Sequence, residues 1–460
     1  MIFTQYYLDC LSQASYLVGD EDTKQAVIVD PRRDIEEYLQ DAKAQGLTLV
    51  GVINTHFHAD FVSGHLELAE ATGAWIGYGD VAKPDFPFKP LADGERISLG
   101  EVTLEIMTTP GHTPESISIV VYQHPGDDVA YGVLTGDALF IGDVGRPDLL
   151  ASIGVSAQEL GVMLYDSIQH KLMGLADEVR VFPAHGAGSA CGKNLSTETQ
   201  STIGEQRRFN YACQPMTQEE FIAVVTADQP AAPAYFVYNA TINRKEREVR
   251  ELDTVVPGLS GAEVDAALAD GAVVHDARGN QDFATGALSG SINVPADGRM
   301  AETVGMVFDP EEKVIIIAPE GQEQETAVRF ARIGFDHVIG YVANPEEYFL
   351  AHQDQMIQAS RLTATQADEA LDGGRVQLVD IRNAGEVADG MIPGAVHIPL
   401  AELGRRSDEL ERNVPVLLYC AGGWRSSVGA SLLRARGFTD VSDLLGGYGA
   451  WDATHGELVG

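Results

Sequence analysis

The sequence predicts an α/β protein of several domains, with a β-rich N-terminal half followed by two copies of one α/β domain. The chain has 460 residues, whereas single domains usually hold about 100–200. In the N-terminal half, short apolar runs end in His or Asp. In the rest of the chain, an internal repeat pairs an apolar strand with a helical pattern. Strands that alternate with helices indicate a parallel sheet.

The composition favours small-molecule chemistry. Hydrophobic residues make up 45% of the chain, enough to bury cores, and the formal net charge is −37. This excess of acid repels phosphates, which argues against nucleic acid and anionic membrane surfaces as partners. Free thiols in a reducing cytoplasm fit the four widely spaced cysteines, Cys10, Cys191, Cys213 and Cys420. Because neither a signal peptide nor a membrane span is apparent, we expect a cytoplasmic protein.

The N-terminal half contains five β-like runs: "QAVIVD", "LTLVGVINTH", "EVTLEIMTTPGH", "AYGVLTGD" and "EVRVFPAH". The last four end in His or Asp, and strand ends are places where a rigid scaffold presents reactive side chains. We therefore expect one shared site. Its candidate ligands are His56, His58, Asp60, His112, Asp137 and His185. Six such residues at strand ends predict a metal site.

Four of these segments resemble the metallo-β-lactamase superfamily: "THFHAD", "PGHTPES", "TGDALFIGDVGRPDL" and "PAHGAG". Within it, "GDVGRPDL" is similar to the persulfide dioxygenases, also called sulfur dioxygenases. The resemblance covers a first domain, residues 1–252, and implies a four-layered αββα sandwich. It also implies one Fe(II) per chain, held by His56, His112 and Asp137.

The chemistry of the ligands supports one metal. Two imidazoles and one carboxylate leave three coordination positions open, which suits the binding of both O₂ and a thiolate-like sulfur at Fe(II). In hydrolases of the superfamily, a second metal uses the equivalents of Asp60, His185 and the residue at Phe61, and Phe61 cannot coordinate a metal. The alternative is a two-zinc thioester hydrolase of the glyoxalase II type.

Three further polar residues of the loops are expected to support the metal ligands. His58 and His185 would orient ligands or the substrate sulfur, and Asp60 would hydrogen-bond a ligand imidazole.

Other residues of these loops have a structural and a functional interpretation. Arg146 either pairs with Asp148 inside the fold or binds a carboxylate of the substrate carrier, and we favour the structural pair. For Cys191 we favour a buried thiol over a sulfur relay. Surface charge is the favoured interpretation of Lys193, Arg207 and Arg208.

The second half repeats itself when "VVHDARGNQDFATGALSGSINVP" is aligned with "QLVDIRNAGEVADGMIPGAVHIP". The alignment pairs Asp276 with Asp380, Arg278 with Arg382, Gly286 with Gly390, Gly290 with Gly394 and Pro295 with Pro399. It predicts two α/β domains, residues 253–356 and 357–460. In each, an apolar strand ("KVIIIA" or "VPVLLYC") precedes a helix ("ETAVRFARIGF" or "SSVGASLLRARGF").

The final repeat contains a candidate reactive cysteine. In "LLYCAGGWRSSVGASLL", Cys420 ends a strand, a Gly-containing loop follows, and Arg425 lies at the start of a helix. Backbone N–H groups, the helix N-terminus and Arg425 would stabilise a thiolate, or a persulfide attached to it. The segment resembles the rhodanese, or sulfurtransferase, family. The resemblance implies that Cys420 carries sulfur, that Arg425 assists it, and that the persulfide loop comprises Ala421, Gly422, Gly423 and Trp424.

The middle repeat departs from this pattern. Ala318 stands where Cys420 does, and "APEGQEQE" brings three glutamates to a loop that should attract anions. We therefore expect an inactive rhodanese-like module, kept for spacing, dimer contacts or docking. The matched pair of Asp380 and Arg382 is expected to be a structural salt bridge.

Together the two sites predict a protein of sulfide detoxification or sulfur assimilation. The expected first reaction is the oxidation of a low-molecular-weight persulfide, such as glutathione persulfide, by O₂ to sulfite and thiol. The expected second reaction is transfer of a sulfane sulfur among persulfide, sulfite and thiosulfate through Cys420. We expect a homo-oligomer. A further alternative is that the C-terminal half senses persulfides or docks partners instead of transferring sulfur.

Overall fold

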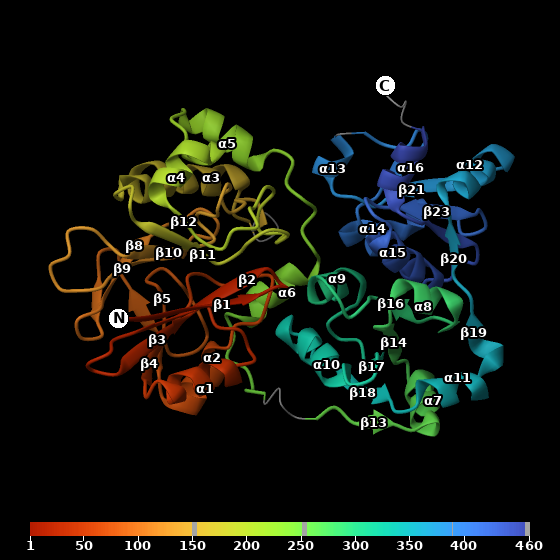
Figure 1. Ribbon diagram of the computed structural model, residues 1–460, viewed down its shortest axis with the longest axis horizontal. Coiled ribbons are helices and arrows are strands. Elements are labelled where there is room, and N and C mark those ends of the chain that lie inside the picture. Colours follow the sequence, from red (N-terminus) through yellow and green to blue (C-terminus); the bar gives the residue numbers. More distant parts are fainter. Residues whose placement is uncertain (150–153, 251–254, 389, 456–460) are drawn as a thin grey trace. The chain divides into compact units, whose positions relative to one another are not determined.

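The computed structural model describes residues 1–149, 154–250, 255–388 and 390–455 (Figure 1). Two compact units make up the chain. One holds Met1–Ala232 and Phe236–Leu252, and the other holds Pro233–Tyr235 and Asp253–Gly460. The expected boundary between residues 252 and 253 lies outside the described residues. None of the described helices is long and apolar enough to cross a bilayer.

Two six-stranded sheets form the N-terminal unit, in the orders β1-β2-β3-β4-β5-β6 and β12-β11-β10-β9-β8-β7. The strands of the first are β1 (Ile2–Leu8), β2 (Gln13–Gly19), β3 (Gln25–Val29), β4 (Thr48–Ile53), β5 (Trp75–Gly79) and β6 (Lys89–Leu91). Those of the second are β7 (Arg96–Ser98), β8 (Thr103–Thr108), β9 (Ile117–Tyr122), β10 (Gly132–Gly136), β11 (Arg180–Pro183) and β12 (Ser201–Thr202). All five strands expected from the sequence are among them.

Side chains of these strands alternate between two cores. In β2, Tyr16 and Val18 face the core between the sheets, whereas Leu17 packs on the outer face. Alternation of this kind is the period of an extended strand.

The helices of the N-terminal unit are α1 (Glu36–Ala44), α2 (His65–Thr72), α3 (Ala157–Asp166), α4 (Ile203–Phe209), α5 (Gln218–Thr226) and α6 (Tyr235–Ile242). Buried residues of α1 and α2 cover one sheet, and those of α3 and α5 cover the other.

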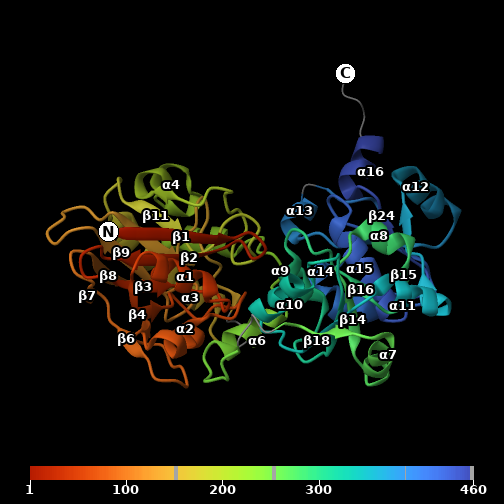
Figure 2. The ribbon, with the colours of Figure 1, turned by 60° about the horizontal axis from the view of Figure 1, so that its bottom comes forward.

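The N-terminal unit is therefore the predicted αββα sandwich. In Figure 1 and Figure 2, α2 and α4 lie on opposite sides of the strands. The candidate ligands follow the ends of four strands: β4, β8, β10 and β11. Since β10 and β11 are parallel neighbours, the residues after them emerge at the same edge of their sheet.

Two five-stranded parallel sheets form the second unit, in the orders β13-β18-β17-β14-β16 and β20-β24-β23-β21-β22. The strands of the first are β13 (Gly258–Leu259), β14 (Val273–Asp276), β16 (Ile292–Asn293), β17 (Val314–Ile317) and β18 (Val338–Val342). Those of the second are β20 (Ser360–Leu362), β21 (Gln377–Asp380), β22 (Val396–His397), β23 (Val416–Tyr419) and β24 (Val441–Leu444).

Helices surround both sheets. They are α7 (Gly261–Ala269), α8 (Asn280–Thr285), α9 (Met300–Val307), α10 (Glu323–Arg332), α11 (Pro345–Ala351), α12 (Ala364–Gly373), α13 (Ala384–Ala388), α14 (Leu400–Arg406), α15 (Trp424–Ala435) and α16 (Gly447–His455). A short pair, β15 (Ala287–Leu288) with β19 (Met356–Ile357), crosses the expected boundary at residue 357. That boundary thus falls inside a strand that still pairs with the middle module.

The two sheets confirm the internal repeat. Asp276 lies beside Ile317 in one and Asp380 beside Tyr419 in the other, so Ala318 and Cys420 directly follow equivalent strands. The expected salt bridge between Arg382 and Asp380 is present at 2.7 Å, and the middle module carries its counterpart at 2.6 Å. Because each aspartate is buried, the pair is a structural anchor of the repeat.

Candidate metal centre and candidate sulfur-transfer site

Three buried side chains of the N-terminal unit lie close together and could hold a metal ion: His56, His112 and Asp137. Their nearest ligand atoms all lie within 4.8 Å of one another. From Asp137 Oδ2, the Nε2 atoms of His56 and His112 are 3.8 and 3.4 Å away. This oxygen is buried and accepts no hydrogen bond from the described residues. A buried carboxylate oxygen that faces two imidazole nitrogens fits a metal ion.

Hydrogen bonds orient both imidazoles toward that point. His112 Nδ1 lies 3.0 Å from the carbonyl of Arg146, to which it donates. His56 Nδ1 lies 3.0 Å from the hydroxyl of Thr55, which in turn donates to Asp30 over 2.9 Å. With Nδ1 protonated in each ring, Nε2 keeps the lone pair that a metal requires.

His185 lies between two carboxylates. Its Nδ1 is 2.8 Å from Asp137 Oδ1, and its Nε2 is 2.7 Å from Asp60 Oδ2. Burial alone would lower the pKa of His185, but the charges of Asp137 and Asp60 outweigh it and raise that pKa well above its usual value. His185 therefore holds Asp137 in place through Oδ1 and leaves Oδ2 for a metal.

Phe61 stands at the sequence position where hydrolases of the superfamily have a ligand of the second metal. Its ring is 1% exposed and packs 4.3 Å from the ring of His58, centroid to centroid. His58 Nε2 is bonded to Asp30 Oδ1 at 2.9 Å. His58 Nδ1 is buried and has no hydrogen-bond partner among the described residues. One imidazole nitrogen next to the ligands is thus left for a bound molecule.

A second group of potential ligands, Asp60, His185 and Cys191, also lies within 4.8 Å. Burial, followed by the charges of Asp137 and Asp60, raises the pKa of the Cys191 thiol well above its usual value. Cys191 is thus a buried thiol, and no disulfide joins the four cysteines of the chain, all of which are buried.

Arg146 is held by the fold on every side of its guanidinium. It forms two 2.7 Å bonds to the Asp148 carboxylate and donates to the carbonyls of Ala190 and Pro230. Its backbone N–H donates to the carbonyl of Cys191 over 3.0 Å. Through these contacts Arg146 links its own loop to the segments that hold Ala190 and Pro230.

The basic residues after Cys191 have local partners. Lys193 donates to the carbonyls of Val224 and Ala227. Arg207 pairs with Asp177, and the Arg208 guanidinium lies 5.6 Å from the centre of the Phe209 ring. None of these contacts involves a candidate metal ligand.

The second candidate site surrounds Cys420 in the last repeat. The sulfur lies 3.1 Å from the backbone nitrogen of Gly423, which donates to it, and 3.6 Å from Ser426 Oγ. Gly423, which directly precedes α15 as its N-cap, has φ +89°, a backbone conformation that favours glycine. Ala421 and Gly422 are exposed, whereas Cys420 is 1% exposed. The loop thus directs the backbone N–H of Gly423 at the sulfur.

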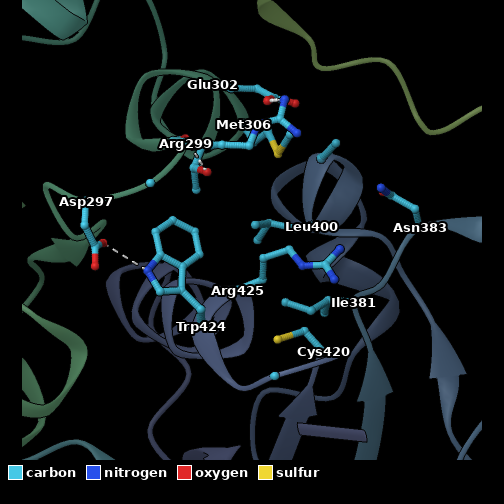
Figure 3. Close-up of a pocket in the computed structure, with 14 residues that line it drawn as sticks. Asp297, Arg299, Glu302, Met306, Ile381, Asn383, Leu400, Cys420, Trp424 and Arg425 are labelled. Carbon is cyan, nitrogen blue, oxygen red and sulfur yellow. Dashed lines mark hydrogen bonds and ion pairs between the residues drawn. The ribbon is translucent and has the colours of Figure 1, made fainter. Parts of the chain in front are cut away.

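Arg425 lies beside this sulfur. Its guanidinium forms two bonds, of 2.6 and 2.8 Å, to the carboxylate of Glu386. Burial would lower the pKa of Arg425, but Glu386 and then Cys420 outweigh it and raise that pKa. Figure 3 shows Cys420, Trp424 and Arg425 around one cavity.

Comparison with known proteins identifies the two units. The model of the metallo-beta-lactamase superfamily matches residues 8–185, and that of the rhodanese-like domain matches residues 363–454. The persulfide dioxygenase ETHE1 of human mitochondria is 31% identical over 217 residues, which are 46% of this chain and 75% of that protein. The chain belongs to the persulfide dioxygenase family of the metallo-β-lactamase superfamily.

This member of the persulfide dioxygenase family is also similar to a hydrolase and to a metallo-β-lactamase of known structure. A hydroxyacylglutathione hydrolase from Synechococcus is 31% identical over 185 residues, 39% of this chain and 67% of that protein. The crystal structure of a metallo-β-lactamase from Staphylococcus aureus shares the fold with a TM-score of 0.67 at 31% identity. It covers 74% of this chain and 98% of that chain.

The segment "GDVGRPDL", which carries the likeness to persulfide dioxygenases, serves the metal site through its backbone. A Cβ atom at Gly145 would lie 1.9 Å from the carbonyl oxygen of Asp137 and 3.1 Å from His112 Nδ1. Asp143 accepts hydrogen bonds from the backbone of Val144, Lys193 and Asn194. Neither role was apparent from the sequence alone.

Asp30 is a further residue of the site that sequence reasoning missed. It accepts hydrogen bonds from Thr55 N and Oγ1 and bonds His58, so it supports two residues of the metal loop. The sequence did contain a pattern that indicates Asp30, because this residue directly follows the strand "QAVIV", as the other site residues follow their strands.

Proposed function

We propose that this protein oxidises a low-molecular-weight persulfide, such as glutathione persulfide, with O₂ and one water molecule to sulfite and thiol, and that it transfers sulfane sulfur through Cys420. The observation that supports the first part most strongly is the set of His56, His112 and Asp137 around one unpaired carboxylate oxygen. The relatives named persulfide dioxygenases support the same reaction class.

The donor set suits one Fe(II) ion. Two imidazole nitrogens and one carboxylate oxygen are the ligands of non-haem iron oxygenases, in which the metal supplies open positions for O₂ and substrate. His185 keeps the carboxylate of Asp137 oriented, and Arg146 and Thr55 keep the two imidazoles oriented. The unbonded Nδ1 of His58 offers a hydrogen-bonding position to the persulfide sulfur.

At Cys420, the proposed reaction is sulfur exchange. The Cys420 thiolate attacks the outer sulfur of R–S–SH. The S–S bond of the carrier breaks as the new S–S bond forms, and R–S⁻ leaves with the electron pair. Atoms and charge balance as R–S–SH plus Cys–S⁻ gives R–S⁻ plus Cys–S–SH. The N–H of Gly423 and the charge of Arg425 stabilise anionic sulfur in both states.

Anaerobic purification with metal analysis, followed by O₂ uptake with glutathione persulfide, tests the first reaction. We expect about one iron per chain in the wild type. His56→Ala and His112→Ala should lose the iron and the O₂ uptake, and Phe61→Leu, the matched control in the same pocket, should keep both. Two tightly bound zinc ions per chain, with thioester hydrolysis and no O₂ uptake, would show the hydrolase instead.

The hydrolase alternative is suggested by the Synechococcus relative, whose identity to this chain equals that of human ETHE1. Two observations oppose it. Phe61 supplies no ligand, and both ring nitrogens of His185 are already bonded to carboxylates.

Cys420→Ser tests the second reaction. We expect it to abolish persulfide formation on the C-terminal domain and to leave O₂ uptake unchanged. If sulfur exchange persisted in this variant, the domain would be a sensing or docking module. Ala318 is the reason that we assign no sulfur transfer to the middle module.

A further inference from the structure

The cavity beside Cys420 is lined by both repeats of the second unit (Figure 3). Its volume is about 450 Å³. The last repeat contributes Ile381, Leu400, Cys420, Trp424 and Arg425, and the middle repeat contributes Asp297, Arg299, Glu302, Thr303 and Met306. The latter five lie on α9 or directly before it. The module without a nucleophile therefore supplies one wall of the cavity, which we call the α9 wall.

Contacts between the repeats hold the α9 wall in place. The indole Nε1 of Trp424 donates to Asp297 Oδ1 over 3.3 Å, and the side chain of Asn280 donates to the carbonyl of Trp424 over 3.4 Å. Deeper in the interface, the backbone N–H of Asn293 donates to Ser431 Oγ over 2.9 Å. Helix α9 also packs on α14. The wall is thus tied to the persulfide loop itself.

The size of the cavity favours an organic ligand. Pockets that bind small organic molecules usually measure about 300–1,000 Å³, and 450 Å³ falls within this range. A thiosulfate ion would leave most of the space unfilled. Met306 points into the cavity from α9, and Leu400 and Trp424 add further apolar surface to its lining (Figure 3).

The charges of the cavity also disfavour an inorganic dianion. Both guanidinium groups that line it already pair with carboxylates, Arg425 with Glu386 and Arg299 with Glu302. Asp297 adds a further negative charge to the α9 wall. A doubly negative ion gains little in such surroundings, whereas a carrier that also bears a positive charge is attracted to Asp297.

We propose that the α9 wall, from Asp297 to Met306, selects the molecule that loads Cys420, and that this molecule is an organic persulfide of small-peptide size rather than thiosulfate. The inference rests on the proposed sulfur transfer at Cys420. It assigns the catalytically inactive module a role in the specificity of its neighbour.

Two substitutions at Met306 test the proposal in the full-length protein, with cyanide as the acceptor and glutathione persulfide or thiosulfate as the donor. Met306→Trp should raise the KM for glutathione persulfide about tenfold or more, because the larger side chain fills the cavity. The KM for the smaller thiosulfate ion should rise by less than about threefold. Met306→Ala should raise the KM for glutathione persulfide about 3- to 10-fold through lost contact. The control is Leu350→Trp on α11 of the same module, where the side chain is 70% exposed.

The outcomes separate this inference from the proposed function. If mass spectrometry detects no sulfur on Cys420 of the wild type with either donor, the sulfur transfer itself is wrong. If Cys420 gains sulfur but both donors respond equally to the Met306 variants, or thiosulfate is the better donor, the α9 wall does not select the carrier. Thermal melting identifies any variant that fails to fold. If Met306→Trp does not fold, the comparison of the two donors in Met306→Ala tests the proposal.

Discussion

At the scale of single residues, Gly145 shows how closely the metal site is packed. Its Cα faces the carbonyl oxygen of Asp137, where a Cβ atom would come within 1.9 Å. We predict that Gly145→Ala displaces the metal ligands and lowers iron affinity about 10- to 100-fold. Iron bound per chain after anaerobic reconstitution measures the effect. Gly174→Ala, which meets no atom within 4 Å, is the control, and equal iron content in both variants would contradict the prediction.

Arg425 offers a prediction for the second site. Its planar guanidinium bonds Glu386 through two nitrogens, a geometry that lysine cannot reproduce. Arg425→Lys should therefore slow sulfur exchange at Cys420 about 10- to 100-fold. Stopped-flow measurement of persulfide consumption gives the rate. Arg412→Lys, at a side chain 47% exposed, should have no effect. A rate equal to that of the wild type in Arg425→Lys would show that the positive charge alone is sufficient.

At the scale of elements, Asp20 ties the turn after β2 to the turn before β8. Its carboxylate accepts hydrogen bonds from the backbone of Asp22, Thr23, Glu101 and Val102. The bond from Thr23 is the largest cause that lowers the pKa of Asp20 from 3.8 to about 2. A lowered pKa in the folded state means that the unfolded chain takes up the proton first.

The stabilisation by Asp20 should therefore be complete above pH 3.8 and should disappear as the pH falls toward about 2. We predict that Asp20→Asn lowers the Tm of the N-terminal unit by about 2–4 °C at neutral pH. The difference from the wild type should shrink below pH 3.8. Calorimetry across this range measures it, and a difference independent of pH would contradict the assignment.

At the scale of the whole molecule, the two compact units should unfold separately. Each has its own cores, and the repeats of the second unit share buried hydrogen bonds such as that between Asn293 and Ser431. We predict two thermal transitions in anaerobic calorimetry. Fe(II) should raise the Tm of the N-terminal unit only, because a ligand stabilises the state that binds it. In His56→Ala this rise should vanish, and a single transition that shifts as a whole would show that the units are coupled.

Strand ends carried most of the information about the metal site. The positions of His56, His112, Asp137 and His185 after β4, β8, β10 and β11 followed from local patterns, because an apolar run and a turn lie next to each of these residues in the chain. The hydrogen bonds of His185 to two carboxylates did not follow from these patterns. Such contacts join residues far apart in the sequence, and no local pattern encodes them.

By itself, the sequence determined the fold class, the internal repeat and the absence of a nucleophile at Ala318, since each depends on residue types at short or constant spacing. Only the tertiary structure decided that Gly145 must lack a side chain, that Asp30 supports the metal loop, and that α9 of the middle module lines the cavity of Cys420. The physical reason is the same in each case. Close approach of backbone, buried hydrogen bonds and the walls of a cavity arise from segments that meet only when the chain has folded.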